Sequence, residues 1–148
     1  MEISYSPIGV VHTPFKTFEG IPRSPEAGQG VRATVEIFEK YKEGLKDLDG
    51  FSHIMLICHF HRSKGYKLEV WPPMDSRSHG LFATHSPNRP NPIGISVVEL
   101  EGIEDNLVYI RNLDILDGTP LLDLKPYIPE YDRDTEFKTG WFAEAKKS

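Results

Sequence analysis

Two histidines, His59 and His61, stand two residues apart after a run of apolar residues. Side chains two apart on an extended strand share a face, so this pair could supply two ligands to a metal ion. Zinc sites use three or more protein ligands, and the sequence does not indicate which of His53, His79 or His85 would complete one. The interpretations that stay open are a metal centre, an ordinary polar barrel face and a contact to a small molecule.

A proline-rich segment is the second candidate, Ser86-Pro87-Asn88-Arg89-Pro90-Asn91-Pro92-Ile93-Gly94. Each proline fixes its own φ and holds the preceding residue extended, so the segment loses little entropy when it becomes ordered. Prolines donate no amide hydrogen, which leaves nearby carbonyls free to accept one from a ligand. Arg89 could present its planar donors to a carboxylate or phosphate. The alternative is a stiff surface crossover in which Arg89 forms an intramolecular salt bridge.

A third candidate is the turn Asp117-Gly118-Thr119-Pro120, which follows Asp114. Asp and Gly are ordinary turn formers, so the turn is a weak signal by itself. Gly28-Gln29-Gly30 does not follow a strand, and neither a phosphate-binding loop nor a dinucleotide fingerprint is present. A G-x-S-x-G elbow, a kinase motif set and H-E-x-x-H are also missing from the sequence.

The elements that must position these residues are mainly strands. We expect a mainly β, antiparallel protein with barrel or sandwich architecture, because short strand-like runs alternate with Gly, Pro and Asp. A three-residue loop, Glu104–Asn106, predicts a hairpin, and Phe38–Leu45 predicts one short helix. Gly118–Pro129 holds three prolines and is predicted to be an extended loop. The predicted strands are Ile3–His12, Arg32–Phe38, Ser52–His61, Lys67–Trp71, Gly80–Thr84, Ile93–Ile103 and Leu107–Asp114.

Length and composition favour one compact domain. The chain has 148 residues, of which 39% are hydrophobic. We expect a barrel domain over residues 1–132 and a C-terminal tail over 133–148, where Trp141 and Phe142 could dock a short helix. The single cysteine, Cys58, predicts a buried thiol and a reducing compartment. The chain has neither a signal-peptide pattern nor an apolar run of about 18 residues, so we expect a soluble cytoplasmic protein without membrane contact.

Charge is unevenly distributed along the chain. The net charge of −5 argues against a protein that binds nucleic acid through its overall charge. Arg62 to Arg89, however, carries a local balance of +3, whereas Glu99 to Glu136 carries −8. Tyr66, Trp71 and Phe82 interleave with the basic segment, so it could meet a polyanion through phosphates and stacked bases. Solvated loop charges are the alternative.

Two long stretches together resemble a known family. Phe82 to Ser96, with Thr84-His85-Ser86-Pro87-Asn88-Arg89-Pro90-Asn91-Pro92-Ile93-Gly94, and Asp117 to Tyr127 resemble the signature stretches of the TsaA-like (TrmO) family. Shorter matches occur in the family's order, so the resemblance spans about Ile8 to Pro129. They are Ile8-Gly9-Val10, Thr13-Pro14-Phe15, Pro22-Arg23, Leu48-Asp49-Gly50-Phe51-Ser52-His53 and Phe60-His61.

The resemblance implies an antiparallel β-barrel with short peripheral helices, which forms a homodimer. It also implies S-adenosylmethionine as methyl donor and, as acceptor, the threonylcarbamoyladenosine beside the anticodon of transfer RNA. No metal is implied. We assign substrate binding to Arg89, because it belongs to the basic segment. Carried over by position, the cofactor-binding residues are Pro25, Glu26, Ala27, His61, Arg62, His85, Ile95, Asp117, Gly118, Thr119 and Pro120.

Two departures from the family pattern bear on these assignments. His85 stands where the family commonly has arginine, and histidine is shorter and only partly charged near neutral pH. Longer relatives carry a second domain that this sequence lacks, so RNA recognition would come from the barrel dimer alone.

Methyl transfer depends mainly on positioning and on the exclusion of water. The acceptor nitrogen must lose its proton, and His61 and Asp117 are candidate bases because both belong to cofactor-binding segments. Two other hypotheses remain: a sensor module that binds S-adenosylmethionine without catalysis, and a metal enzyme built on His59 and His61.

Overall fold

The computed structural model describes residues 1–17, 19, 21, 30–131 and 134–147. The chain divides into two compact units. The first unit comprises Met1–Arg62 and Ile93–Tyr127, and the second comprises Ser63–Pro92 and Ile128–Ser148. The second unit is therefore built from an insertion between two strands of the first unit and from the C-terminal segment.

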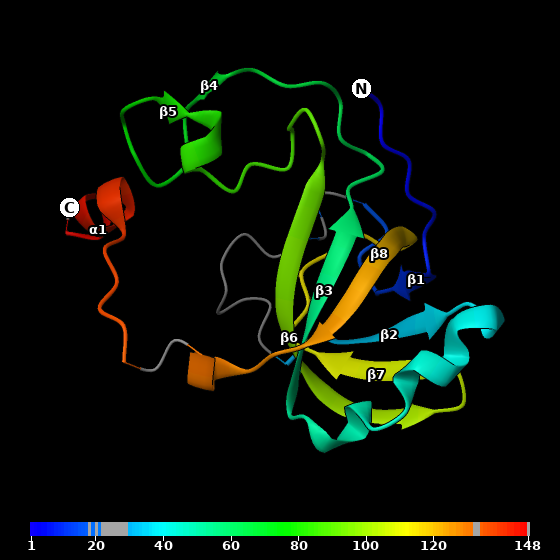
Figure 1. The fold of residues 1–148 in the computed structure, drawn as a ribbon. Helices are drawn as coiled ribbons and strands as arrows, with labels where there is room; N and C mark the ends of the chain where they lie inside the picture. Colours follow the sequence, from blue (N-terminus) through cyan, green and yellow to red (C-terminus); the bar gives the residue numbers. More distant parts are fainter. Residues whose placement is uncertain (18, 20, 22–29, 132–133, 148) are drawn as a thin grey trace. The chain divides into compact units, whose positions relative to one another are not determined.

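Six antiparallel strands of the first unit form a closed barrel in the order β1-β2-β7-β6-β3-β8 (Figure 1). A closed barrel leaves no strand edge unpaired. The prediction of a mainly β, antiparallel barrel is confirmed. The strands are β1 (Gly9–His12), β2 (Arg32–Ile37), β3 (His53–His59), β6 (Ile93–Glu104), β7 (Leu107–Arg111) and β8 (Thr119–Pro126).

Alternate side chains of each strand fill the barrel. On β3, Ile54, Leu56 and Cys58 point inward and are fully buried, while their neighbours along the strand face outward. Burial raises the pKa of the Cys58 thiol to about 12, so this cysteine stays protonated and unreactive. The other fully buried barrel residues include Val11, Val35, Val98, Val108, Ile110 and Leu121.

The predicted hairpin and helix are found, with differences in detail. Glu104 pairs with Leu107 across a two-residue turn, in which Asp105 has a positive φ of 56°. The predicted helix Phe38–Leu45 is a 3-10 helix, η2 (Glu39–Leu45), and η3 (Leu48–Gly50) follows it.

The segment Gly118–Pro129 was wrongly expected to be a loop, because most of it is strand β8. Its prolines lie near the ends of the strand, where a missing amide hydrogen disturbs few ladder bonds. Pro120 precedes the first residue that pairs with β3, which is Leu121, and Pro126 is the last residue of the strand. Strand β8 pairs with both β1 and β3, and without it the barrel would not close.

Several predicted strands differ in extent. The expected strand Ile3–His12 begins only at Gly9, and Ser52–His61 is confined to His53–His59, which leaves His61 beyond the strand. The run Leu107–Asp114 ends as strand at Arg111, because Asn112 adopts a positive φ of 72°. The expected strand Gly80–Thr84 is wrong: the amide of Thr84 bonds to the carbonyl of Leu81, which curls this segment into a 3-10 turn.

The second unit contains a two-stranded ribbon and short helices. Trp141 holds the C-terminal helix in place: its ring stacks on His79 at 4.4 Å, and its Nε1 donates a 2.8 Å hydrogen bond to the carbonyl of Ala83. The elements are β4 (Glu69–Val70), β5 (His79–Gly80), η4 (Leu81–Ala83), η5 (Pro129–Tyr131) and α1 (Gly140–Lys146). Among the described residues, no helix combines the length and apolar character needed to cross a membrane.

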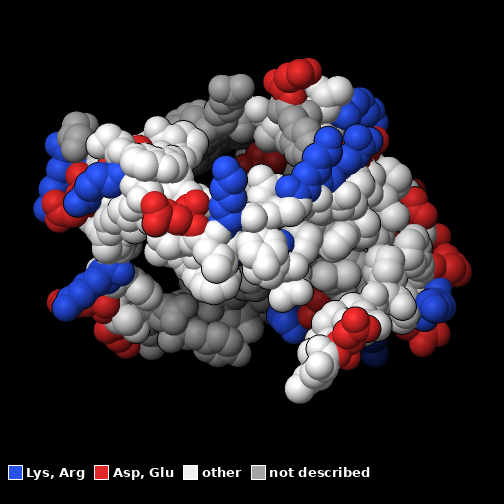
Figure 2. Space-filling model, turned by 90° about the horizontal axis from the view of Figure 1, so that it is seen from above, with Lys and Arg blue, Asp and Glu red and all other residues white. Residues whose placement is uncertain are grey.

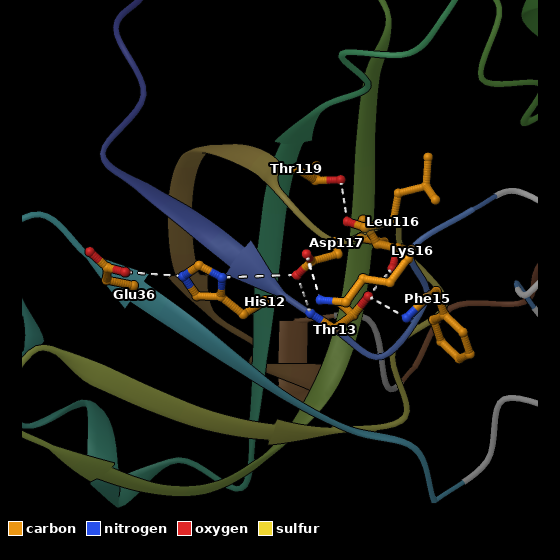
Figure 3. Close-up of polar contacts among 9 residues, drawn as sticks. His12, Thr13, Phe15, Lys16, Glu36, Leu116, Asp117 and Thr119 are labelled. Carbon is orange, nitrogen blue, oxygen red and sulfur yellow. Dashed lines mark hydrogen bonds and ion pairs between the residues drawn. The ribbon is translucent and has the colours of Figure 1, made fainter.

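A cluster of polar contacts centred on Asp117 joins the two ends of the barrel sheet (Figure 3). Oδ1 of Asp117 accepts a 3.0 Å hydrogen bond from the amide of Thr13, and Oδ2 accepts one of 2.7 Å from Nζ of Lys16. The amide of Asp117 donates to the carbonyl of Phe15, and that of Gly118 donates to the carbonyl of Val11. We call these contacts the Asp117 clasp. They tie the segment after β1 to the segment before β8.

The clasp also sets the charge of its carboxylate. The hydrogen bond from Lys16 and the amide of Thr13 hold the pKa of Asp117 below its usual value, although partial burial opposes them. A depressed carboxyl pKa contributes stability that is present above the unfolded-state pKa and is lost as pH falls through the folded-state pKa.

We predict that Asp117→Asn lowers the free energy of unfolding at neutral pH by about 1 kcal/mol, because the amide cannot accept the charge-assisted bond from Lys16. The loss should be modest, since Lys16 is largely exposed to water. The difference between wild type and variant should shrink as pH falls below about 4. Urea denaturation at several pH values measures both effects.

Asp123→Asn is the matched control, because Asp123 forms a 3.0 Å pair with Lys125 on the exposed surface of β8, the strand that follows Asp117. This control should change stability by less than about 0.5 kcal/mol. Equal losses of unfolding free energy in the two variants would mean that the Asp117 clasp stabilises the protein no more than an ordinary surface ion pair does.

Candidate functional site

One end of the barrel gathers most of the residues that the sequence analysis assigned to a cofactor. Because the strands are antiparallel, β3 ends where β6 and β8 begin. His61 and Arg62 follow the end of β3, Ile95 is near the start of β6, and Asp117–Pro120 leads into β8. Residues far apart in sequence are thereby brought to the same end of the first unit.

The turn Asp117–Pro120 presents its backbone. Gly118 has a φ of 83°, a conformation that favours glycine, and there is open space where a Cβ would be. Thr119 is buried, and its hydroxyl donates a 2.7 Å hydrogen bond to the carbonyl of Leu116. The side chains of Asp117 and Thr119 thus serve the shape of the turn, which leaves Gly118 and Pro120 at its accessible surface.

His61 and Arg62 lie in an exposed turn after β3. Partial burial, the positive charge of Arg62 and the neighbouring His59 lower the pKa of His61. His61 is therefore neutral at physiological pH and able to accept a proton. The residue before it, Phe60, lies against Gly94 so closely that no side chain would fit at that glycine, which fixes where this turn leaves the barrel.

The outer face of β6 beside this turn is apolar and open. Ile95 is 66% exposed, and Ile93 and Val97 on the same face are 41% and 44% exposed. Across β3 they pair with His59, Ile57 and Met55. Ile95 therefore offers an apolar surface next to the polar turns.

Another part of the barrel's outer surface is charged. A cavity of about 340 Å³ there is lined by His12, Lys16, Arg32, Glu101, Tyr109 and Asp117, among others. Nε2 of His12 lies 3.0 Å from Glu36, and its Nδ1 lies 3.9 Å from Asp117 (Figure 3). The guanidinium of Arg32 pairs with Glu101 at 3.2 Å. Acids and bases here neutralise one another. No local sequence pattern indicates this cluster, because its members come from separate strands.

Two of the assigned residues, His85 and Arg89, belong to the second unit. Nη1 of Arg89 donates hydrogen bonds to the carbonyls of Thr84 (2.8 Å) and Ser86 (3.2 Å), and its guanidinium lies 5.9 Å from the centre of the Phe82 ring. The guanidinium thus braces the proline-rich loop internally, by carbonyl bonds instead of the salt bridge considered as an alternative. His85 is exposed and lines a cavity of this unit.

Three assigned residues, Pro25, Glu26 and Ala27, lie outside the described part of the chain. The metal hypothesis gains no support: the described residues hold no group of three or more His, Cys, Asp or Glu arranged to bind a metal. His59 is half-buried on β3, whereas His61 is in the turn beyond it, so the two do not share a strand face as expected.

Charge on the molecular surface is mixed. In the view of Figure 2, Lys and Arg are interspersed with Asp and Glu. The first unit nevertheless carries nine Lys and Arg against fifteen Asp and Glu, and the second carries eight against seven. The barrel is therefore strongly acidic, whereas the second unit is close to neutral.

Comparison with known proteins identifies relatives over most of the chain. A probable S-adenosyl-L-methionine-binding protein of Pyrococcus abyssi is 52% identical over 139 residues, which cover 94% of this chain and 76% of the relative. A tRNA (adenine(37)-N6)-methyltransferase of Mus musculus is 39% identical over 133 residues, which are 85% of this chain but only 31% of the relative.

A solved structure has the same fold. The crystal structure of TrmO from Pseudomonas aeruginosa superposes with a TM-score of 0.79 at 37% identity and covers 95% of this chain and 63% of that one. This chain therefore spans less than two thirds of the Pseudomonas and mouse proteins. The sequence pattern of the tRNA-methyltransferase O N-terminal domain matches residues 10–133. The chain belongs to the tRNA-methyltransferase O N-terminal domain family.

Proposed function

We propose that this protein is an S-adenosylmethionine-dependent methyltransferase that methylates N6 of threonylcarbamoyladenosine beside the anticodon of transfer RNA. Family membership and the activities named for its relatives support the reaction class. The observation that carries the proposal is that His61, Arg62, Ile95 and Asp117–Pro120 gather at one barrel end. We also propose a cytoplasmic location, because the single cysteine is a buried, unpaired thiol and free thiols are typical of reducing compartments.

The residues at this end suit such a cofactor. Arg62 offers exposed donors for a carboxylate, Ile95 offers an apolar surface, and the space at Gly118 lets a ligand approach the backbone of the turn. When bound, S-adenosylmethionine supplies the electrophilic methyl group. The protein's task is to hold donor and acceptor in line and to exclude water. The family resemblance also assigns Pro25, Glu26, Ala27 and His85 to cofactor binding.

We assign the role of proton acceptor to His61. Asp117 is a poor base, since both of its oxygens already accept hydrogen bonds and its pKa is lowered. The pKa of His61 is also lowered, but only from the ordinary histidine range, so its imidazole is neutral near pH 7 and can accept the proton that the nitrogen releases. Arg89 is the proposed contact to an RNA phosphate, through the edge of the guanidinium that does not brace the loop.

The first prediction from this proposal is methyl transfer itself. Purified protein with methyl-labelled S-adenosylmethionine should label transfer RNA that carries threonylcarbamoyladenosine, and should not label transfer RNA from cells that cannot make this modification. The cofactor should bind in the micromolar range, which is typical of small-ligand sites. Calorimetry and scintillation counting measure the two quantities.

The sensor hypothesis is the second candidate, favoured by the names of the archaeal relatives, which state only binding of S-adenosylmethionine. Cofactor binding without label in any transfer RNA would support the sensor and contradict the enzyme. The absence of both heat and thermal shift at millimolar cofactor would reject both hypotheses.

We also predict the pH dependence of methylation. If neutral His61 accepts the proton, kcat/KM should rise with pH on the acid side, with a midpoint below about 6.5, and should be flat above it. His61→Asn should remove this acid limb and lower the rate. His53→Asn is the control, because His53 lies at the other end of β3 and should leave the profile unchanged. An acid limb that persists in His61→Asn would assign the proton transfer to another group.

We further propose that the protein is a homodimer whose interface borders the cofactor pocket on the apolar face of β6. Contiguous exposed apolar residues are uncommon on soluble monomers, and Ile93, Ile95 and Val97 form such a surface with Met55 and Ile57. Twofold dimers are the commonest assembly.

Val97→Glu should dissociate this dimer, because an unpaired charge would be buried at the interface. Light scattering across micromolar concentrations should report a dimer for wild type and a monomer for the variant. Thr34→Glu, on the charged outer face of the barrel, should remain dimeric. A monomeric wild type, or a dimeric Val97→Glu, would reject this interface.

A further inference from the structure

The second unit contains a cavity that shares only His85 with the residues assigned to the cofactor. It has a volume of about 840 Å³, within the range of small-molecule sites. Its walls come from three segments: Val70–Met74, Ala83–Pro87, and Thr139, Trp141 and Phe142 of the C-terminal region. All of them belong to the second unit.

The walls are apolar and aromatic, and they carry almost no charge. Trp71 is 67% exposed, so a ring face is available to a ligand. No Asp, Glu, Lys or Arg lines the cavity, and His85 is its one titratable side chain among the described residues. His85, Ser86 and Thr139 provide hydrogen-bonding groups. Such a site suits a flat, uncharged heteroaromatic ring with polar edges.

The cavity is held rigid by contacts behind its walls. Trp141 is fixed by its stack on His79 and its hydrogen bond to Ala83. It therefore forms part of the cavity wall and is not the surface on which a ligand stacks. His79 is itself bonded to Asp75 at 2.7 Å. The carbonyl bonds of Arg89 and the ring of Pro87 stiffen the opposite segment. A preformed cavity loses little entropy when a ring enters.

The distribution of charged residues between the two units indicates which class of molecule carries the bound ring. The second unit carries eight Lys and Arg against seven Asp and Glu, whereas the barrel carries nine against fifteen. A polyanion is therefore repelled less by the unit that holds the cavity. Lys64, Lys67 and Arg77, in the segments that adjoin its walls, can meet phosphates near a bound base.

We infer that this cavity binds an unpaired nucleobase of a single-stranded RNA segment, stacked on Trp71. The inference rests on the proposed function, since it assigns a base of the RNA substrate to the second unit. The C-terminal helix thereby gains a role, because it supplies one wall of the site.

Binding of a fluorescein-labelled oligoadenylate, measured by anisotropy, tests the inference without any methyl transfer. An abasic strand of the same length separates base stacking from phosphate attraction. Wild type should bind oligoadenylate more tightly than the abasic strand, and Trp71→Ala should reduce its affinity about tenfold, as expected for one stacked base. Trp71→Phe should retain most of the affinity. Phe137→Ala is the matched control: Phe137 is 68% exposed in the same unit and does not line the cavity.

A second variant tests the same cavity independently, in case Trp71→Ala loses its structure. Met74→Trp should fill the cavity from another wall and weaken oligoadenylate binding while the melting temperature stays at the wild-type value. Equal affinity of wild type for the two strands, or unchanged binding by both Trp71→Ala and Met74→Trp, would overturn the inference.

Cofactor affinity provides the last comparison. S-adenosylmethionine also contains adenine, and its binding to Trp71→Ala should equal its binding to wild type. A parallel loss of cofactor and oligoadenylate affinity would assign the ring to the cofactor and overturn the inference. If wild type binds oligoadenylate through Trp71 but methylates no transfer RNA, the proposed function fails and the base site stands. If it methylates transfer RNA and Trp71→Ala binds and methylates equally well, the base site fails alone.

Discussion

Closure of the barrel between its first and last strands is the constraint on which the rest of the first unit depends. The β1–β8 seam is short, with three residue pairs, and one of them includes Pro120, which has no amide hydrogen to donate. An unclosed seam would expose the edges of two strands. The Asp117 clasp adds the hydrogen bonds that the ladder lacks, through the amides of Thr13, Asp117 and Gly118.

The same clasp determines what the turn Asp117–Pro120 can do. Because Lys16 and Thr13 occupy its carboxylate, Asp117 acts mainly by fixing the turn, and the open backbone at Gly118 is the part available to a ligand. The barrel also has two distinct outer faces. One is covered by ion pairs around Glu101 that neutralise one another, and the other is apolar along the first half of β6, from Ile93 to Val97. Charged residues that satisfy one another make a stable surface, whereas an uncovered apolar face favours contact with a partner.

Local features of the fold could be predicted from the sequence, and non-local ones could not. The β6–β7 hairpin follows from two alternating runs with Asp105 and Asn106 between them, and the alternation on β3 identifies its buried face. Strand β8 was missed because proline is a general sign against strands, and only the barrel order shows that Pro120 and Pro126 lie where donors are not needed. Gly80–Thr84 resembles a strand in composition, but the Thr84–Leu81 hydrogen bond curls it.

The same distinction between local and non-local features applies to the candidate site. The family resemblance named Asp117, but Thr13 and Lys16 are about a hundred residues away from it, and no local pattern links them. Trp141 could be expected to dock, yet its partner His79 could not, since a stack between distant rings leaves no periodic signal. The separation into two units was also hidden, because the second unit combines the insertion between β3 and β6 with a C-terminal segment that is distant in sequence.

The proposed reaction requires that an acidic protein gain its affinity for RNA from something other than overall charge. Neutralisation of many phosphates would give strong binding to any RNA, and a barrel with fifteen acids and nine bases is not suited to it. Stacking of unpaired bases and close fit to one modified nucleoside are the remaining sources of affinity, and both depend on which base is presented. For the proposed substrate, weak electrostatic attraction would favour selectivity, because most RNA would be bound poorly and the anticodon loop would be retained by its exposed bases. Under the two proposals made above, the near-neutral second unit would hold the RNA strand and the acidic barrel would position the methyl donor.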